Sequence, residues 1–90
     1  MLYRIYTEAV QLSEIEKIFL NRGINSFSFV RQDGYWKGAP ESSLVLEVFD
    51  ETEELENHVY AIAEEIRALN DQDVVYVAAV PLRAVKSITL

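Results

Sequence analysis

The order of strand-like and helix-like patterns constrains the fold of this chain more than any other feature of its sequence. Residues 2–7 and 24–31 read as strands on either side of a helical pattern that begins at Ser13. Residues 44–49 form a third strand pattern, and a second, longer helical pattern separates them from the valine-rich run Val74 to Val80. This order of β, α, β, β, α, β predicts a ferredoxin-like α+β fold, an antiparallel four-stranded sheet with two helices on one face.

The helix ends carry their own signals. Ser13 and Glu16 have the spacing of a capping box, so we expect the first helix to start there, and Gly23 is suited to end it because glycine takes a positive φ. Asp50 or Thr52 is expected to cap the second helix. An apolar stripe predicts the buried face of that helix: Leu55, Val59, Ile62, Ala63, Ile66 and Leu69.

The composition of the turns and strands predicts a loop at residues 35–37, a central strand at Val74 to Val80, and the role of the C-terminal segment. Gln32-Asp33-Gly34 has turn composition and Gly38-Ala39-Pro40 interrupts pairing, so residues 35–37 between them are expected in a loop. Val74 to Val80 is near-continuous in β-branched residues, which is typical of a central strand buried on both faces. Ala84 to Leu90 is either a short edge strand or an arm that docks on a neighbouring chain.

A chain of 90 residues has room for one core, so we expect a single domain that is marginal alone. Two helices on one face leave the other face of the sheet open. We expect that open face to carry one set of side chains from Val74 to Val80 and some of Tyr3, Ile5, Phe27 and Phe29. Other copies of the chain are expected to cover it, which predicts a homo-oligomer.

Charge and composition narrow the partners. The net charge of -7 repels phosphate groups, so neither nucleic acid nor an anionic membrane is expected as a partner. No run approaches the roughly 20 apolar residues that a membrane span needs, and no secretory signal is recognised, so we expect a cytoplasmic protein. Without cysteine there is no disulfide framework and no thiolate chemistry.

The candidate ligand-binding residues are Tyr35, Trp36, Lys37, Glu41 and Gln72. Trp36 is suited to stack on a planar ligand, Lys37 to pair with an anion, and Glu41 to accept hydrogen bonds from an amine or hydroxyl. The aromatic pair is equally suited to pack on a neighbouring chain, and both roles are compatible because ligand sites often lie where subunits meet. Gln72 either reaches a cleft at the end of the sheet or remains an ordinary turn amide.

Standard catalytic signatures are missing from the sequence. It has no phosphate loop, no nucleophile elbow and no zinc motif. His58 flanks the apolar stripe without a cysteine or a clearly placed serine, so we assign it no catalytic role. The carboxylates of the second helix lack the spacing of a calcium site and are expected to be solvated, so neither a metal nor a cofactor is expected.

The hairpin region, the strand after it, and a later valine-rich strand closed by Pro81 resemble the nitrogen-regulator PII-like superfamily, and within it the CutA divalent-cation tolerance family. The residues that carry this resemblance are Tyr35, Trp36, Gly38, Glu41 and Ser42. The resemblance implies one PII-like domain over residues 1–90, in trimers whose sheets pack into a central core with ligand clefts between subunits. Our first expectation is therefore a homotrimer that binds a small nucleotide-like or cationic metabolite without chemistry of its own.

A second resemblance, within the same fold, is to the phage S-adenosylmethionine lyases. They also show a glycine-flanked tyrosine before the third strand, a glutamate near its start, and a Gln-Asp pair before a valine-rich last strand, which here are Tyr35, Glu41 and Gln72-Asp73. This resemblance implies Tyr35 or Trp36 over the sulfonium, Glu41 as an electrostatic partner and Gln72 as an orienting amide, in an enzyme that works by positioning and desolvation. Whether the chain is an enzyme stays open at this point. A structural or protein-interaction module without a small-molecule site is the third alternative.

Overall fold

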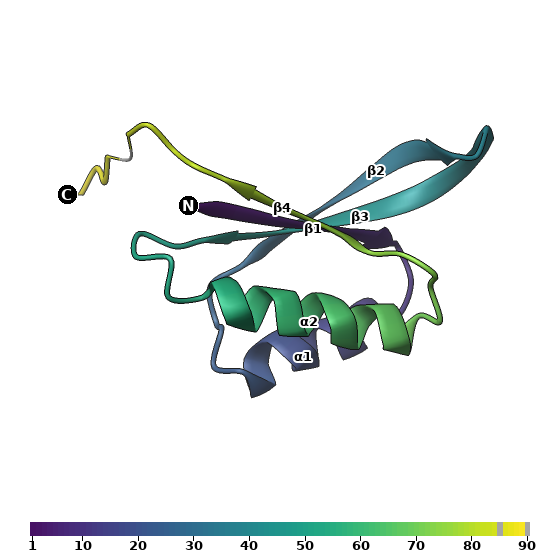
Figure 1. Ribbon diagram of the computed structural model, residues 1–90, viewed down its shortest axis with the longest axis horizontal. Helices are drawn as coiled ribbons and strands as arrows, with labels where there is room; N and C mark the ends of the chain where they lie inside the picture. Colours follow the sequence, from purple (N-terminus) through teal and green to yellow (C-terminus); the bar gives the residue numbers. More distant parts are fainter. Residues whose placement is uncertain (85, 90) are drawn as a thin grey trace.

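The computed structural model describes residues 1–84 and 86–89, and its elements follow the predicted order. They are β1 (Leu2–Glu8), α1 (Leu12–Asn21), β2 (Ser28–Trp36), β3 (Ala39–Phe49), α2 (Glu56–Leu69) and β4 (Tyr76–Val80). The strands form one four-stranded sheet in the order β2-β3-β1-β4, and every pairing is antiparallel. Both helices lie against the same face of this sheet (Figure 1). The predicted α+β ferredoxin-like fold is confirmed.

The core fills the space between the helices and the sheet. Side chains of β1 alternate between buried and partly exposed, with Tyr3, Ile5 and Thr7 facing the helices. The register of β3 places Val48, Leu46 and Leu44 directly opposite these three residues. The helices complete the core with Ile15, Phe19, Val59, Ile62, Ala63 and Ile66. The predicted buried stripe of α2 is confirmed for Val59, Ile62, Ala63 and Ile66, while Leu55 and Leu69 are only partly buried against the core.

The valine-rich run does not form a central strand. β4 lies at an edge of the sheet next to β1, and the central strands are β1 and β3. Its side chains are exposed or only partly buried. The prediction was wrong because β-branched composition reports how well a residue fits a pleated strand, and that preference is shared by central and edge strands. The strand does end directly before Pro81, as expected.

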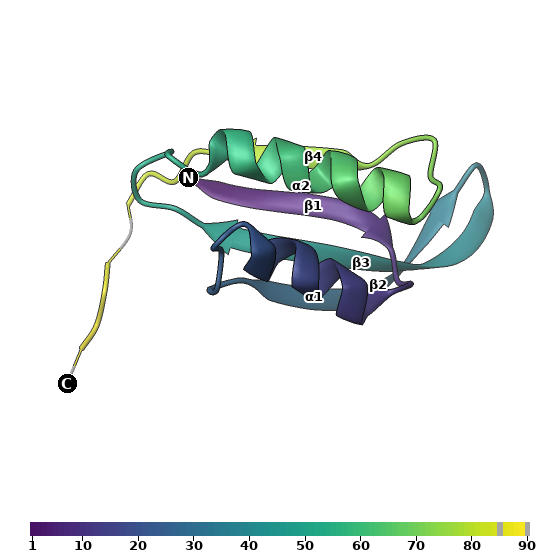
Figure 2. The ribbon, with the colours of Figure 1, turned by 90° about the horizontal axis from the view of Figure 1, so that it is seen from below.

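The β2–β3 hairpin is longer than predicted. Gln32-Asp33-Gly34 continues β2, and the chain reverses only at Lys37 and Gly38, whose φ values are 49° and 80°. Because Trp36 pairs with Ala39, these two residues form the whole loop, and positive φ at both is the conformation of a two-residue hairpin turn. The arm that results projects beyond the rest of the sheet (Figure 2).

The first helix begins without the predicted capping box. α1 starts at Leu12, and the preceding residue, Gln11, has a φ of 54° and makes no side-chain cap hydrogen bond. Ser13 and Glu16 therefore lie inside the helix, and neither closes its end. The predicted end of the helix is confirmed, since Gly23 has a φ of 76° two residues after the last helical residue.

The second helix begins later than predicted, at Glu56. Asp50 organises the turn that precedes it, accepting hydrogen bonds from the backbone N–H groups of Thr52 at 3.0 Å and Leu55 at 2.9 Å. Burial raises the pKa of the Asp50 carboxyl, but these hydrogen bonds and that of the Thr52 hydroxyl outweigh it, so the pKa lies below its ordinary value. Asp50 therefore fixes the path into α2 without being its cap.

The open face of the sheet carries one set of β4 side chains, Tyr76, Ala78 and Val80, as expected, but none of the four residues expected there from the rest of the chain. Tyr3 and Ile5 face the helices. Phe29 pairs with the core residue Leu46, so it lies on the helix side too. Phe27 stacks on Phe19 of α1 with ring centroids 4.4 Å apart, so it also belongs to the helix side. The expectation was wrong for these four residues because the face of a strand depends on register, which side-chain composition does not reveal.

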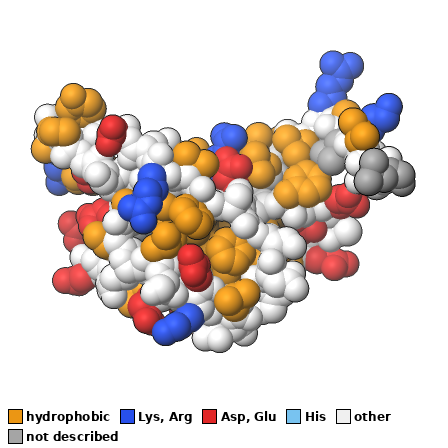
Figure 3. Space-filling view, turned by 180° about the vertical axis from the view of Figure 1, so that it is seen from behind, with side chains coloured by type: hydrophobic (Ala, Val, Ile, Leu, Met, Phe, Trp, Pro, Cys, Tyr) orange, Lys and Arg blue, Asp and Glu red, His pale blue; other side chains and the backbone are white. Residues whose placement is uncertain are grey.

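A row of apolar side chains crosses the open face from one edge to the other. The pairings place Val30, Val45, Tyr6 and Tyr76 side by side across the four strands. Val30 and Tyr76, at its two ends, are 52% and 58% exposed. The neighbouring row is polar at its centre, where Arg4 Nε lies 3.0 Å from Glu47 Oε1. In Figure 3 hydrophobic side chains also reach the surface at the tip of the hairpin arm.

The segment from Ala84 to Leu90 was expected as an edge strand or an arm. Val85 and Leu90 lie outside the described residues, and 84 and 86–89 form neither helix nor strand. The chain leaves the end of β4 and extends away from the sheet (Figure 1). Within the described part of the chain, neither helix has the length and apolar character needed to cross a membrane.

Candidate functional site

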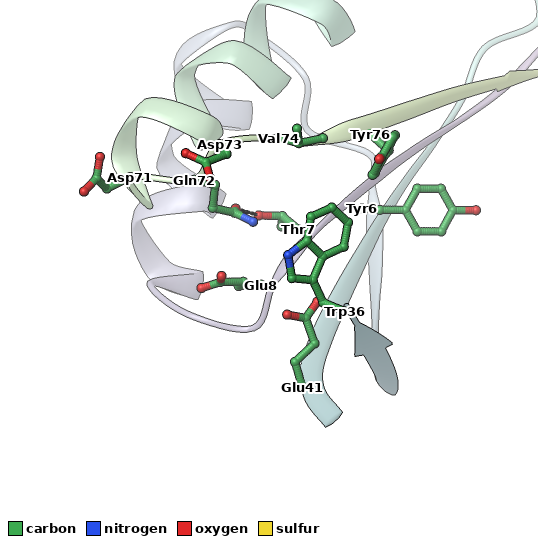
Figure 4. Close-up of a pocket in the computed structure, with 10 residues that line it drawn as sticks. All are labelled: Tyr6, Thr7, Glu8, Trp36, Glu41, Asp71, Gln72, Asp73, Val74 and Tyr76. Atoms are coloured by element: carbon green, nitrogen blue, oxygen red, sulfur yellow. Dashed lines mark hydrogen bonds between the residues drawn. The ribbon is translucent and has the colours of Figure 1, made fainter. Parts of the chain in front are cut away.

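A cleft of about 250 Å³ opens where β1 ends, between the β2–β3 hairpin and the loop that joins α2 to β4. Its walls come from three parts of the chain (Figure 4). They are Tyr6, Thr7 and Glu8 of β1, Trp36 and Glu41 of the hairpin, and Asp71, Gln72, Asp73, Val74 and Tyr76 of the loop and β4. Three of the five candidate residues from the sequence, Trp36, Glu41 and Gln72, thus meet in one place.

Strand alternation decides which aromatic residue of the hairpin enters the cleft. Trp36 pairs with Ala39, and Glu41 pairs with Gly34, so Trp36 and Glu41 share a face. Tyr35 points to the other face, is 77% exposed, and does not line the cleft. The Trp36 ring lies 6.5 Å from the ring of Tyr76, centroid to centroid, at an interplanar angle of 58°. The two rings form an aromatic wall.

Lys37 also lies outside the cleft. It occupies the hairpin turn, and its Nζ is 5.8 Å from the centroid of the Trp36 ring. This is a cation–π contact, which helps to hold the indole in its orientation. Lys37 therefore supports Trp36, and the structure does not bring it to the place where an anionic ligand group would lie.

The cleft is acidic. Glu8, Glu41, Asp71 and Asp73 line it, and its lining contains no lysine, arginine or histidine among the described residues. Figure 4 shows Glu8 and Glu41 on the side of the indole nitrogen, while the Asp71 carboxylate points away from the other residues. Carboxylates without a paired cation in a partly enclosed cleft attract positively charged ligands.

Arg67 lies behind the loop rather than in the cleft. Its Nη1 donates to the backbone carbonyl of Gln72 at 3.3 Å, and its Nη2 lies 2.6 Å from Glu64 Oε1. The hydrogen bond to Glu64, with the charges of Glu64, Asp71 and Asp73, raises the pKa of this guanidinium further. Arg67 thus braces the backbone that carries Gln72 and offsets part of the negative charge of the loop.

Gln72 is held in place by a polar network at the end of the sheet. Thr7, only 4% exposed, donates its hydroxyl to Gln72 Oε1. Asn70 Nδ2 donates to Thr7 Oγ1 at 3.3 Å and to Gln72 Oε1 at 3.4 Å. Gln72 is therefore more than a turn amide, because its side chain joins the loop to the end of β1.

Sequence reasoning missed the contribution of β1 to this site. Tyr6, Thr7 and Glu8 line the cleft, yet none was a candidate. The available signal was that Thr7 and Glu8 are consecutive polar residues at the end of a strand, where side chains reach the edge of the core. The sequence likewise predicts Tyr76 in a strand buried on both faces, whereas it is 58% exposed beside Trp36.

Aromatic surfaces beside carboxylates suit a flat, positively charged organic ligand. The rings offer stacking and cation–π contacts, the carboxylates accept hydrogen bonds from amines and hydroxyls, and the amide of Gln72 offers a neutral polar contact. Among the described residues no group of three or more histidine, aspartate or glutamate side chains is placed to hold a metal ion.

Solved structures share this fold. A phage S-adenosylmethionine lyase in its apo state superposes with a TM-score of 0.71 at 23% identity, over 84% of this chain and 75% of that one. A phage S-adenosylmethionine lyase in complex with S-methyl-5'-thioadenosine gives 0.70 at 22% identity, over 84% and 76%. A DUF3240 family protein from Shewanella baltica OS155 gives 0.70 at 9% identity, over 98% and 94%.

No family model matches the sequence, and no curated protein matches it. At these identities the three superpositions establish the fold alone. The resemblance to PII-like and CutA proteins stays a prediction. The chain is thus similar in fold to phage S-adenosylmethionine lyases and to a DUF3240 protein.

Proposed function

We propose that this protein binds S-adenosylmethionine in the cleft beside Trp36 and cleaves it as a lyase. One observation carries the proposal, namely that the cleft joins aromatic rings to Glu8 and Glu41, and that no described residue in its lining is a cation. S-adenosylmethionine has a flat adenine ring, a sulfonium and an ammonium group, and these match such a surface. The fold shared with phage S-adenosylmethionine lyases supports the same assignment.

The proposed reaction needs little from the protein beyond positioning. The carboxylate of the substrate attacks its own Cγ, the new C–O bond forms, and the electron pair of the breaking C–S bond goes to sulfur. The products are S-methyl-5'-thioadenosine and homoserine lactone, and no proton is transferred. A positive and a negative charge cancel as the bond forms, so water stabilises the reactants more than the transition state, and excluding it lowers the barrier.

The residues of the cleft have separate roles in this proposal. Trp36 and Tyr76 exclude water and contact the nucleoside and the sulfonium. Glu8 and Glu41 hold the substrate ammonium, whose charge does not change during the reaction, so they contribute mainly to binding. Gln72 orients the part of the substrate that reacts.

We further propose that the protein forms a homotrimer, as the resemblance to PII-like proteins implies. The apolar row across the open face ends at Tyr76, which also lines the cleft, so a copy packed on this face would border the ligand. Sites for ligands of this size usually measure about 300–1,000 Å³. The cleft of one chain, about 250 Å³, is smaller, which supports closure by a second copy. We propose one domain over residues 1–90 and a cytoplasmic location, as expected from the sequence.

Incubation of the purified protein with S-adenosylmethionine, followed by chromatography, tests the activity. The expected result is accumulation of S-methyl-5'-thioadenosine and homoserine lactone in equal amounts, at a rate proportional to protein. A parallel sample of heat-denatured protein gives the spontaneous rate. Product formation no faster than in that sample would reject the lyase assignment.

A binder without chemistry is the second candidate, and the acidity of the cleft favours it as strongly as it favours the lyase. Glu8 and Glu41 recognise a cation whether or not a bond then breaks. This candidate predicts that S-adenosylmethionine raises the melting temperature, with a stabilisation that grows as RT ln(1 + [L]/Kd), and is recovered unchanged. A protein-interaction module would show neither binding nor turnover.

A further inference from the structure

The amide of Gln72 is fixed in one of its two possible orientations by a directed chain of hydrogen bonds. This series of hydrogen bonds begins at the backbone carbonyl of Leu69, which can only accept. Gln11 Nε2 donates to this carbonyl at 3.1 Å, so the NH₂ group of Gln11 is turned toward the loop. The same nitrogen donates to Asn70 Oδ1 at 3.2 Å. The Asn70 carbonyl oxygen is thereby turned toward Gln11.

The orientation of the Asn70 amide determines the orientation of the Gln72 amide. With its oxygen toward Gln11, Asn70 presents Nδ2 to Thr7 Oγ1 at 3.3 Å, and an NH₂ group can only donate. Thr7 Oγ1 therefore accepts there, and its own proton is free to donate to Gln72 Oε1, which also receives Asn70 Nδ2 at 3.4 Å. Two donors converge on Gln72 Oε1, so the NH₂ group of Gln72 is directed away from both.

The Gln72 NH₂ group faces the cleft. It has no hydrogen-bond partner among the described residues, yet it is not among their buried unpaired polar atoms, so it is open to solvent. Gln72 lines the cleft between Asp71 and Asp73. Figure 4 shows its side chain reaching inward beside Thr7. Every charged side chain that the structure describes in the cleft is a carboxylate, so this amide offers a hydrogen-bond donor without a charge.

We propose that Gln11, Asn70 and Thr7 are positioning residues that hold the Gln72 NH₂ group as the donor to the carboxylate of S-adenosylmethionine, an inference that rests on the proposed function. The carboxylate is the ligand group that Glu8 and Glu41 repel, so it needs a donor elsewhere. A neutral donor orients the substrate carboxylate. A cation in its place would stabilise the negative charge of the carboxylate and so make it a weaker nucleophile toward Cγ.

Asn70→Asp reverses the direction of these hydrogen bonds, because aspartate has nearly the shape of asparagine but can only accept. One carboxylate oxygen still accepts from Gln11, and the other now accepts the Thr7 proton. Thr7 Oγ1 then accepts from the Gln72 NH₂ group, so the amide turns over and presents Oε1 to the cleft. An acceptor then faces the substrate carboxylate, and the affinity for that group is lost.

The experiment compares two ligands that differ in the carboxylate alone. Dissociation constants for S-adenosylmethionine and for its decarboxylated form are measured by stopped-flow fluorescence of Trp36, before any turnover. For Asn70→Asp we expect affinity for S-adenosylmethionine to fall at least about ten-fold, the size of a lost hydrogen bond to a charged group, while that for the decarboxylated ligand falls less than about two-fold. Asn57→Asp, an exposed site on α2, makes the same change of charge and should alter neither.

Gln72→Glu provides a second variant that leaves Asn70 and Thr7 intact, and it should show the same ligand selectivity. Side-chain amide NMR of the free protein tests the chain without any ligand, since the Gln72 NH₂ protons should exchange quickly in wild type and become protected in Asn70→Asp. Equal losses for both ligands, or unchanged exchange, would overturn the proposal. If wild type binds neither ligand, the proposed function fails; if it binds both equally well, only the assignment of the carboxylate fails.

Discussion

Trp36 and Tyr35 are neighbours in the chain, yet the pleat of β2 sends them to opposite faces. Trp36→Ala should weaken binding of S-adenosylmethionine about ten- to a hundred-fold, because stacking on a base and cation–π contact together contribute about 1–3 kcal/mol. Tyr35→Ala is the matched control and should change affinity less than about two-fold, since Tyr35 is 77% exposed outside the cleft. Calorimetry measures both, and equal losses for the two variants would remove Trp36 from the site.

Tyr3 offers a prediction about stability. Its side chain is fully buried, and its hydroxyl has no hydrogen-bond partner among the residues that the structure describes. Burial, together with the nearby charges of Glu56 and Asp50, raises the pKa of this phenol. Tyr3→Phe should therefore keep or increase the free energy of unfolding, by up to about 1 kcal/mol, because an unpaired buried polar group is removed. Urea unfolding measures it, and a loss of stability above about 1 kcal/mol would show that the hydroxyl has a partner in solution.

The sequence predicted some residues of the cleft and not others, for reasons that lie in single residues. Trp36, Glu41 and Gln72 were recognisable because aromatic, acidic and amide side chains stood beside turns. Tyr35 and Lys37 group with them because the sequence predicts the end of β2 before Gly34, whereas the strand runs to Trp36. Once β2 is known to extend to Trp36, alternation alone separates Trp36 from Tyr35.

At the scale of elements, the turn before α2 depends on a charged Asp50. Because hydrogen bonds hold the pKa of Asp50 below its unfolded value of about 3.9, the ionised carboxylate stabilises the fold above that pH, and the stabilisation is lost as pH falls through the folded pKa. Asp50→Asn should lower the free energy of unfolding at pH 7 by about 1–2 kcal/mol, since its NH₂ group cannot accept from Leu55.

Urea unfolding from pH 7 down to pH 2.5 measures this dependence. The difference between wild type and Asp50→Asn should be largest at neutral pH and shrink below about pH 4. Glu51→Gln, an exposed neighbour, is the control and should leave stability nearly unchanged. A difference that grows on acidification would contradict the hydrogen-bonded, ionised Asp50.

The order and type of the elements were predictable, and the position of β4 and the length of the hairpin were not. Periodicity records which residues are buried together, and this fixed the helices and the strands. Val74 to Val80 has the composition of a central strand, but its neighbours are set by how β1 pairs on both sides, which is long-range information. Lys37-Gly38 is a weaker turn signal than Asn-Gly, so the sequence predicts the turn at Gln32-Asp33-Gly34 instead.

The whole molecule should assemble through the open face of the sheet. Light scattering should give a mass near three times the 10.3 kDa of one chain. Val30→Lys, at one end of the apolar row, should shift it toward the monomer, because a charge replaces a buried contact. Leu20→Lys is the control: Leu20 is 55% exposed on α1, on the other side of the sheet, and should leave the mass unchanged. A wild-type mass of one chain would reject assembly through this face.

Recognition of S-adenosylmethionine by the cleft is the central claim, and the intrinsic fluorescence of the protein can measure it. Trp36 is the single tryptophan of the chain and lies in the wall of the cleft. Mixing with increasing S-adenosylmethionine, followed by stopped flow before any turnover, should change its fluorescence saturably. Fluorescence that stays constant to millimolar ligand, together with no heat of binding, would contradict the claim.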